Sequence, residues 1–173
     1  MPVSDQGVTR DRYMLIPRVL IFVTCGEAFL LLKGAPSKRL WENRYNGLGG
    51  HVEPGEDILC AARRELHEEA GLTADLRLCG TLLVDTGENP GIGIFVFTGE
   101  SPFGEPKPSP EGTLHWMNVE AIDGLPGVED LPLLVRRIRG MKRDTPPFSA
   151  RSFYDQAGRL QLEFAADELK SAP

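Results

Sequence analysis

The sequence has no hydrophobic run long enough to cross a membrane. An apolar stretch near the N-terminus, Met14 to Val23, is short and is interrupted by Pro17 and Arg18. A membrane-spanning helix needs about 20 apolar residues, and no small-residue cleavage site of a secretory signal follows the stretch. We therefore expect a cytoplasmic protein without membrane contact, in which this stretch forms a β-strand.

Cysteine is scarce, and basic residues are outnumbered. The three cysteines, Cys25, Cys60 and Cys79, have no metal-ligand spacing, which favours reduced thiols in the core over a redox role. The 19 Lys and Arg residues face 25 Asp and Glu residues, and the formal net charge is −6. Proteins that bind a nucleic acid polymer present a basic surface, so we expect no such partner. An acidic protein still binds polyphosphate when metal ions mediate the contact.

A length of 173 residues favours one domain. We expect a loose segment at 1–12, a single domain at 13–164 and a mobile tail at 165–173, and the sequence leaves both a monomer and a homodimer open. A helix is predicted at 131–139, near the C-terminal end of the domain, with Arg136, Arg137 and Arg139 facing outward. Strand patterns occur at 19–24, 28–33, 76–84, 92–98, 114–119, 148–154 and 159–164.

The most informative segment runs from Gly50 to Leu72 and reads GHVEPGEDILCAARRELHEEAGL. Helical spacing predicts a helix over Asp57–Ala70, because its apolar residues recur every three to four positions. Gly71 suits the left-handed conformation that ends a helix. The apolar positions of this helix are Leu59, Ala62, Leu66 and Ala70.

Three glutamates of this helix, Glu65, Glu68 and Glu69, stand at i, i+3 and i+4 and share one face. Anions this close repel one another unless cations lie among them. Oxygen ligands of this density suit Mg²⁺, or Mn²⁺ in its place. Arg64 is spaced to hold a carboxylate in place. The alternative, a solvated acidic face with an ordinary surface ion pair, does not explain the glycine-rich loop before the helix.

The spacing resembles the Nudix box, Gly-x5-Glu-x7-Arg-Glu-aliphatic-x-Glu-Glu-x-Gly-aliphatic, at every specified position from Gly50 to Leu72. The resemblance implies an α/β fold, an α/β/α sandwich with a central mixed sheet. It also implies a metal-dependent hydrolase that cleaves the pyrophosphate of nucleoside diphosphate derivatives. Such enzymes act on small nucleotides.

The resemblance also assigns roles to residues in and around the box. Glu65, Glu68 and Glu69 would handle the metal, one of them as general base, and Arg64 belongs to the same catalytic set. The Gly49 carbonyl would be a further metal ligand, with a simple turn as the alternative. Glu56 would orient its neighbours without touching the metal. Glu111 would supply an additional carboxylate, or be an ordinary loop residue.

The stretch Tyr45–Val52, YNGLGGHV, resembles the hydrolases of oxidised purine nucleoside triphosphates, which carry Trp-Asn-Gly-Phe-Gly-Gly-Lys-Val here. The resemblance implies that Asn46 contacts the base edge, with a structural asparagine as the alternative. Lys33 and Arg18 would line the same pocket, or extend their charged ends from strand termini into solvent. The expected substrate is a purine nucleoside triphosphate, oxidised or not, cleaved to the monophosphate and pyrophosphate.

The sequence departs from those relatives before the last helix. They use a Trp and a pair of Asp residues to read 8-oxoguanine, whereas this chain has Glu129 and Asp130 without the Trp. The acidic pair would serve the base, with helix N-capping as the alternative for Asp130. Two other functions stay open. One is cleavage of ADP-ribose, ADP-sugars or dinucleotides, whose hydrolases carry a Pro or Tyr close to the position of Pro90, with a turn at Asn89-Pro90-Gly91 as the alternative. The other is a non-catalytic nucleotide sensor.

Overall fold

The computed structural model describes residues 11–36, 41–101 and 109–165, together with residues 7, 9, 106 and 107. The predicted loose segment at 1–12 and the predicted tail at 165–173 lie almost entirely outside the described residues. Within the described part, no helix is long and apolar enough to cross a membrane.

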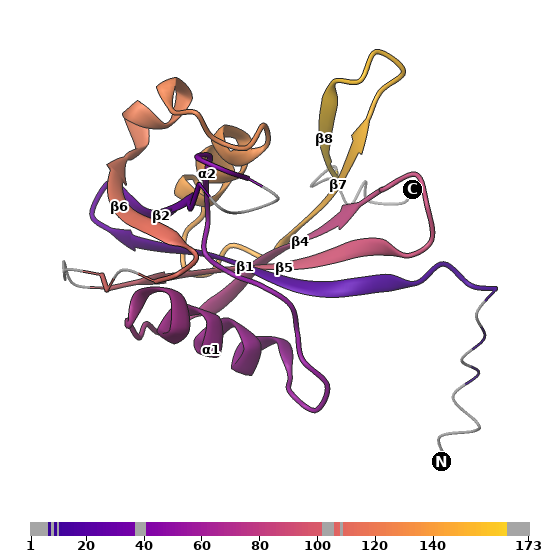
Figure 1. Ribbon diagram of the computed structural model, residues 1–173, viewed down its shortest axis with the longest axis horizontal. Coiled ribbons are helices and arrows are strands. Elements are labelled where there is room, and N and C mark those ends of the chain that lie inside the picture. Colours follow the sequence, from indigo (N-terminus) through magenta and orange to yellow (C-terminus); the bar gives the residue numbers. More distant parts are fainter. Residues whose placement is uncertain are drawn as a thin grey trace, which may run out of the picture.

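One mixed sheet forms the centre of the molecule (Figure 1). Its strand order is β3-β2-β1-β5-β4-β7-β8, and β6 pairs with β2. The strands are β1 (Leu15–Cys25), β2 (Ala28–Gly34), β3 (Tyr45–Asn46), β4 (Arg77–Val84), β5 (Gly91–Glu100), β6 (Gly112–Asn118), β7 (Phe148–Tyr154) and β8 (Leu160–Phe164). The helices are α1 (Ile58–Ala70), the 3-10 helix η2 (Val119–Gly124) and α2 (Leu131–Arg139).

The strands pair in both antiparallel and parallel orientations. β1 and β2 are antiparallel, as are β7 and β8, whereas β1 pairs with β5 and β4 pairs with β7 in parallel. β1 pairs with β2 at their shared turn, where Thr24 pairs with Phe29 and Cys25 with Ala28. Beyond that turn the two strands separate, and this opening receives the loop before α1.

The side chains of β1 alternate between two hydrophobic cores. Val19, Ile21 and Val23 pack with the buried face of α1, whereas Leu20 and Phe22 pack with α2. Because successive residues of a strand point to opposite faces, one strand serves both cores. α1 covers one face of the sheet, and α2 with η2 covers the other (Figure 1). The predicted α/β/α sandwich is confirmed.

Helix α1 begins one residue after the predicted start, with Asp57 as its N-cap, and ends where Gly71 predicts. The Asp57 side chain accepts hydrogen bonds from the N–H groups of Leu59 and Cys60, at 2.8 and 3.0 Å. Such an N-cap stabilises a helix by about 1 kcal/mol. Gly71 ends the helix at φ 65°, in the left-handed conformation, and Leu66 is fully buried.

Two predictions for individual side chains are wrong. Arg137 does not face outward: its guanidinium lies 6.0 Å from the ring centre of Phe148 and 5.5 Å from that of Phe164. Stacking of a planar cation on aromatic rings keeps it half-buried. Cys60 is exposed rather than part of the core, because it lies on the solvent side of α1, while Cys79 is buried as predicted.

Candidate active site

The loop 47–52 fills the opening between β1 and β2. Ile21 and Leu48 exchange two backbone hydrogen bonds, at 2.7 and 3.1 Å. The Val19 N–H donates to the carbonyl oxygen of Gly50 at 2.9 Å. These bonds hold the loop against β1 as a paired strand would be held, and they fix the positions of its glycines.

Two carboxylates of α1 lie along this glycine pair. Gly49 has φ +139°, and a Cβ there would come within 2.1 Å of the Val19 carbonyl oxygen, so only glycine fits. A Cβ at Gly50 would come within 2.4 Å of the Glu65 carboxylate. The Gly49 N–H donates to Oε2 of Glu69 at 2.8 Å, and Glu69 is only 4% exposed. The glycines therefore let the backbone approach both carboxylates closely.

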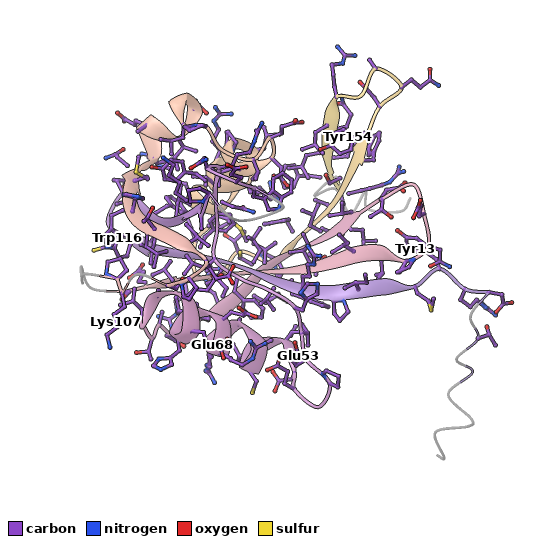
Figure 2. The ribbon with its side chains drawn as sticks, viewed as in Figure 1. Tyr13, Glu53, Glu68, Lys107, Trp116 and Tyr154 are labelled. Carbon is purple, nitrogen blue, oxygen red and sulfur yellow. The ribbon has the colours of Figure 1, made fainter. Side chains whose placement is uncertain are left out.

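Arg64 joins the other acidic side chains. Its guanidinium donates to both carboxylate oxygens of Glu56, at 2.7 and 3.2 Å, to Glu65 at 2.9 Å and to Glu68 at 3.2 Å. It also donates to the His51 carbonyl oxygen at 3.0 Å. The hydrogen bonds from Arg64 lower the pKa of Glu56, and the two nearest carboxylates raise the pKa of Arg64. Glu56 thus anchors Arg64. Figure 2 shows the place of Glu68, another acceptor of Arg64, on α1.

The donor set fits a hard divalent cation in its chemistry, since it consists of carboxylate oxygens beside a glycine backbone. Among the described residues, however, no group of three or more His, Cys, Asp and Glu side chains is arranged around one point as metal ligands are. The reason is visible in the contacts: Arg64 holds Glu65 and Glu68, and the Gly49 N–H holds Glu69. Ligation by Glu68 would compete with its contact to Arg64.

Glu111 lies in the turn that leads into β6. Its carbonyl oxygen accepts a hydrogen bond from the Ala35 N–H at 3.0 Å, and its own N–H donates to the Ser109 hydroxyl at 3.3 Å. The side chain is exposed. These bonds fix the turn, and the role of Glu111 as an additional metal ligand stays a prediction.

The register of β2 with β3 orients two of the predicted pocket residues. Lys33 pairs with Tyr45, and its ammonium lies 5.9 Å from the centre of that ring. Asn46 pairs with Leu32, one position along, so its side chain and that of Lys33 leave the strands on opposite faces. Asn46 Oδ1 accepts from the Gly47 N–H at 2.8 Å. A ligand shared by Lys33 and Asn46 stays a prediction.

The two acidic residues before α2, Glu129 and Asp130, differ in their exposure to solvent. Glu129 is exposed, whereas Asp130 is half-buried, and burial raises the pKa of its carboxyl group. Asp130 occupies the N-cap position, but its side chain makes no capping hydrogen bond. N-capping therefore does not account for this carboxylate. The Val128 N–H donates to the Tyr45 carbonyl oxygen at 3.0 Å, which brings the segment beside β3.

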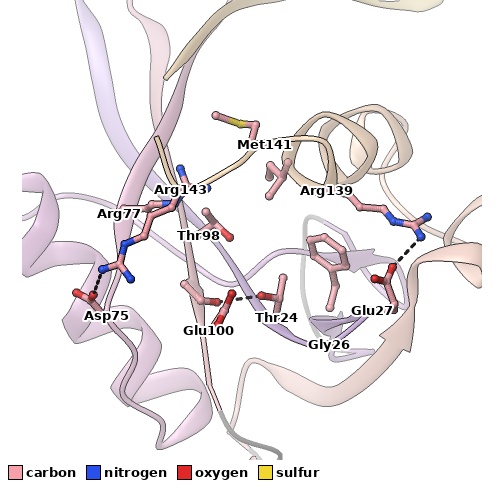
Figure 3. A pocket seen from close by; sticks show the side chains of 13 residues that line it. Thr24, Gly26, Glu27, Asp75, Arg77, Thr98, Glu100, Arg139, Met141 and Arg143 are labelled. Atoms are coloured by element: carbon pink, nitrogen blue, oxygen red, sulfur yellow. Dashed lines mark hydrogen bonds and ion pairs between the residues drawn. The ribbon is translucent and has the colours of Figure 1, made fainter. Parts of the chain in front are cut away.

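A cavity of about 610 Å³ lies away from these residues, between the β1–β2 turn, the end of β5, the start of β4 and the end of α2. Four of its charged side chains pair with one another: Arg139 with Glu27 at 2.7 Å and Arg143 with Asp75 at 3.3 Å (Figure 3). It contains none of the predicted site residues. The candidate site is therefore the loop 47–52 with α1.

The NUDIX domain model matches residues 14–138. This span includes the loop, α1 and most of α2, more than half of the chain. The chain belongs to the Nudix family. It is a Nudix hydrolase that acts on nucleotide derivatives, and hydrolases of this family generally use divalent metal ions.

Relatives and solved structures agree with this assignment. The chain is 33% identical over 111 residues to an oxidized purine nucleoside triphosphate hydrolase of Danio rerio, covering 63% of this chain and 71% of that protein. The crystal structure of a MutT protein from Bacillus halodurans superposes with a TM-score of 0.71 at 24% identity, covering 87% and 97% of the two chains. The Nudix domain of Shewanella oneidensis NrtR, solved with ADP ribose, gives a TM-score of 0.62 at 12% identity, with coverages of 80% and 97%. The two structural matches show the fold alone.

Proposed function

We propose that this Nudix hydrolase cleaves purine nucleoside triphosphates, oxidised ones among them, to the monophosphate and pyrophosphate. The observation that carries the choice of substrate is Asp130, a half-buried carboxyl group with a raised pKa that no capping bond explains. A carboxyl group in such a setting can exchange hydrogen bonds with a purine edge. The named zebrafish relative supports the same substrate class.

Hydrolysis would take place at the carboxylates beside Gly49 and Gly50. We assign metal binding to Glu65, Glu68 and Glu69, together with the Gly49 carbonyl and Glu111. Mg²⁺, or Mn²⁺ in its place, would neutralise phosphate oxygens and lower the pKa of the attacking water. One of the three α1 carboxylates accepts the proton of that water. Arg64 is held by Glu56 and fixes the positions of the carboxylates through its hydrogen bonds.

An alternative substrate class is ADP-ribose and related dinucleotides. The sequence feature that favours it is Pro90, which lies close to the position after the Nudix box where hydrolases of this class carry a Pro or Tyr. The difference between the two classes lies in what flanks the pyrophosphate, so both would use the same carboxylates.

A panel of nucleotides incubated with Mg²⁺ tests the proposal. It should contain dGTP, 8-oxo-dGTP, dATP, ADP-ribose and a dinucleoside polyphosphate, with separate detection of pyrophosphate and phosphate. We expect the largest kcat/KM for a purine triphosphate, with pyrophosphate as product. A larger kcat/KM for ADP-ribose than for every triphosphate would replace this proposal with the alternative.

A further inference from the structure

Arg18 borders the glycine loop on the α2 side of the sheet. By strand alternation it shares a face with Leu20 and Phe22, which pack in the core under α2. Its Nε–H donates to Nε2 of His51 at 3.2 Å, and the two residues also form a backbone bridge between β1 and the loop. The loop thus has carboxylates on one side and a guanidinium on the other.

His51 accepts a hydrogen bond from this guanidinium. Nε2 of the ring accepts the hydrogen bond, so the ring proton lies on Nδ1. The backbone of the same residue is held by Arg64, whose guanidinium donates to the His51 carbonyl oxygen at 3.0 Å. His51 therefore links Arg18 to the carboxylate cluster of α1. A lysine, which the resembling enzymes carry here, has no lone pair to accept such a bond.

Arg18 keeps most of its donors for a ligand. Its bond to His51 uses Nε–H, and no described residue accepts from its two terminal nitrogens. Two forked N–H groups match the oxygens of a phosphate. The loop that Arg18 borders lies between the face that carries Lys33 and the face that carries the α1 carboxylates. A nucleotide that reached from one to the other would cross this loop with its phosphates.

We propose that Arg18 is a phosphate-binding residue and that His51 is the residue that positions it. The proposal rests on the proposed function in one respect, that the ligand carries a pyrophosphate group. It adds a phosphate contact from β1, outside the Nudix box, and gives a role to a histidine that the box does not specify.

Calorimetric binding of inorganic pyrophosphate with Mg²⁺ to the whole chain tests this proposal without any turnover. Arg18→Gln should raise the pyrophosphate Kd about 10- to 100-fold, the usual worth of a charge-assisted hydrogen bond to a phosphate. His51→Ala should raise it by less, and the double variant should bind no more weakly than Arg18→Gln alone. His51→Gln, whose amide oxygen can accept from Arg18, should bind like the unaltered protein.

The matched control is Arg63→Gln, which removes the same charge from an exposed position of α1. It should leave the pyrophosphate Kd within about twofold, and circular dichroism should show each variant folded. An unchanged Kd in Arg18→Gln would overturn the role of Arg18. Additive losses in the double variant, or no rescue by His51→Gln, would overturn the positioning role. These outcomes are independent of which nucleotide is the substrate, which the nucleotide panel decides.

Discussion

Replacing Glu69 by glutamine separates the chemical role of this carboxylate from its structural role. Glu69 is 4% exposed and accepts a hydrogen bond from the Gly49 N–H at 2.8 Å. Glutamine has the same shape, and its amide oxygen can accept the same bond. The negative charge is lost, and the other carboxylate oxygen is replaced by an NH2 group. The metal-free variant should therefore fold, with stability equal to or above that of the unaltered protein, because repulsion with Glu65 and Glu68 falls.

The expected losses can be worked out. If the metal contact of Glu69 supplies about 4 kcal/mol of transition-state stabilisation, kcat/KM falls about 10³-fold. At a metal concentration of about 100 Kd, binding stabilises the folded state by about 2.7 kcal/mol, and a tenfold weaker Kd leaves about 1.4 kcal/mol. For a domain of this size the metal-induced rise in Tm should shrink from about 5–11 °C to about 3–6 °C.

Turnover of the preferred nucleotide and thermal unfolding with and without Mg²⁺ measure both effects. Glu163→Gln, which removes an exposed charge from β8, is the matched control and should change neither. Turnover of Glu69→Gln near the level of the unaltered protein, together with an undiminished metal-induced rise in Tm, would refute the assignment. A variant that unfolds even without metal would show that the charge, rather than the bond to Gly49, holds the loop.

Three further substitutions test the remaining contacts. Arg64 lowers the pKa of Glu56, so this ion pair stabilises the fold above the ordinary glutamate pKa. The stabilisation is lost as the pH falls through the lowered pKa. In acid, the Tm of Arg64→Met should therefore fall less steeply with pH than the Tm of the unaltered protein. Burial raises the pKa of Asp130, so the charged form of this carboxyl group destabilises the fold at neutral pH. Asp130→Asn should raise the Tm near neutral pH, and this gain should vanish below the ordinary aspartate pKa. The same substitution should weaken the preference among bases. Asn46→Ala should lower kcat/KM more for the preferred base than for its competitors, since an unpaired polar group in a pocket costs about 1–3 kcal/mol; equal losses for all bases would assign Asn46 the bond to Gly47 as its role.

The parts of the fold that the sequence predicted are those with local signals. The ends of α1 follow from Asp57 and Gly71, whose effects act within one helical turn. The hairpin of β7 and β8 follows from alternation around a turn. The short strand β3 was not predicted, because it is defined by partners far along the chain: the Tyr45 N–H donates to Pro126, and its carbonyl oxygen accepts from Val128. No pattern within two residues reports such bonds.

In the candidate site, too, contacts between neighbouring segments could be predicted from the sequence, whereas contacts between distant segments could not. The closeness of Glu65 and Glu69 to the two glycines follows from the spacing of one motif, since a loop and the helix after it are covalently joined. The contact of Arg18 with His51 joins residues 33 positions apart and depends on the bridge that places the loop beside β1. The only sequence signal was the histidine itself, at a position where the resembling enzymes carry lysine.

The α1 carboxylates and two cationic side chains of the site lie on opposite faces of the sheet. The carboxylates come from α1 on one face of the sheet, whereas Lys33 and Arg18 point to the face under α2. The two sets meet at loop 47–52, where β1 and β2 have separated. A substrate that uses both must be long, with one end on each face, as a nucleoside polyphosphate is. Replacing Lys33 or Arg18 should therefore weaken nucleotide binding while leaving metal binding at α1 intact, and changes to the α1 carboxylates should slow hydrolysis of every substrate alike.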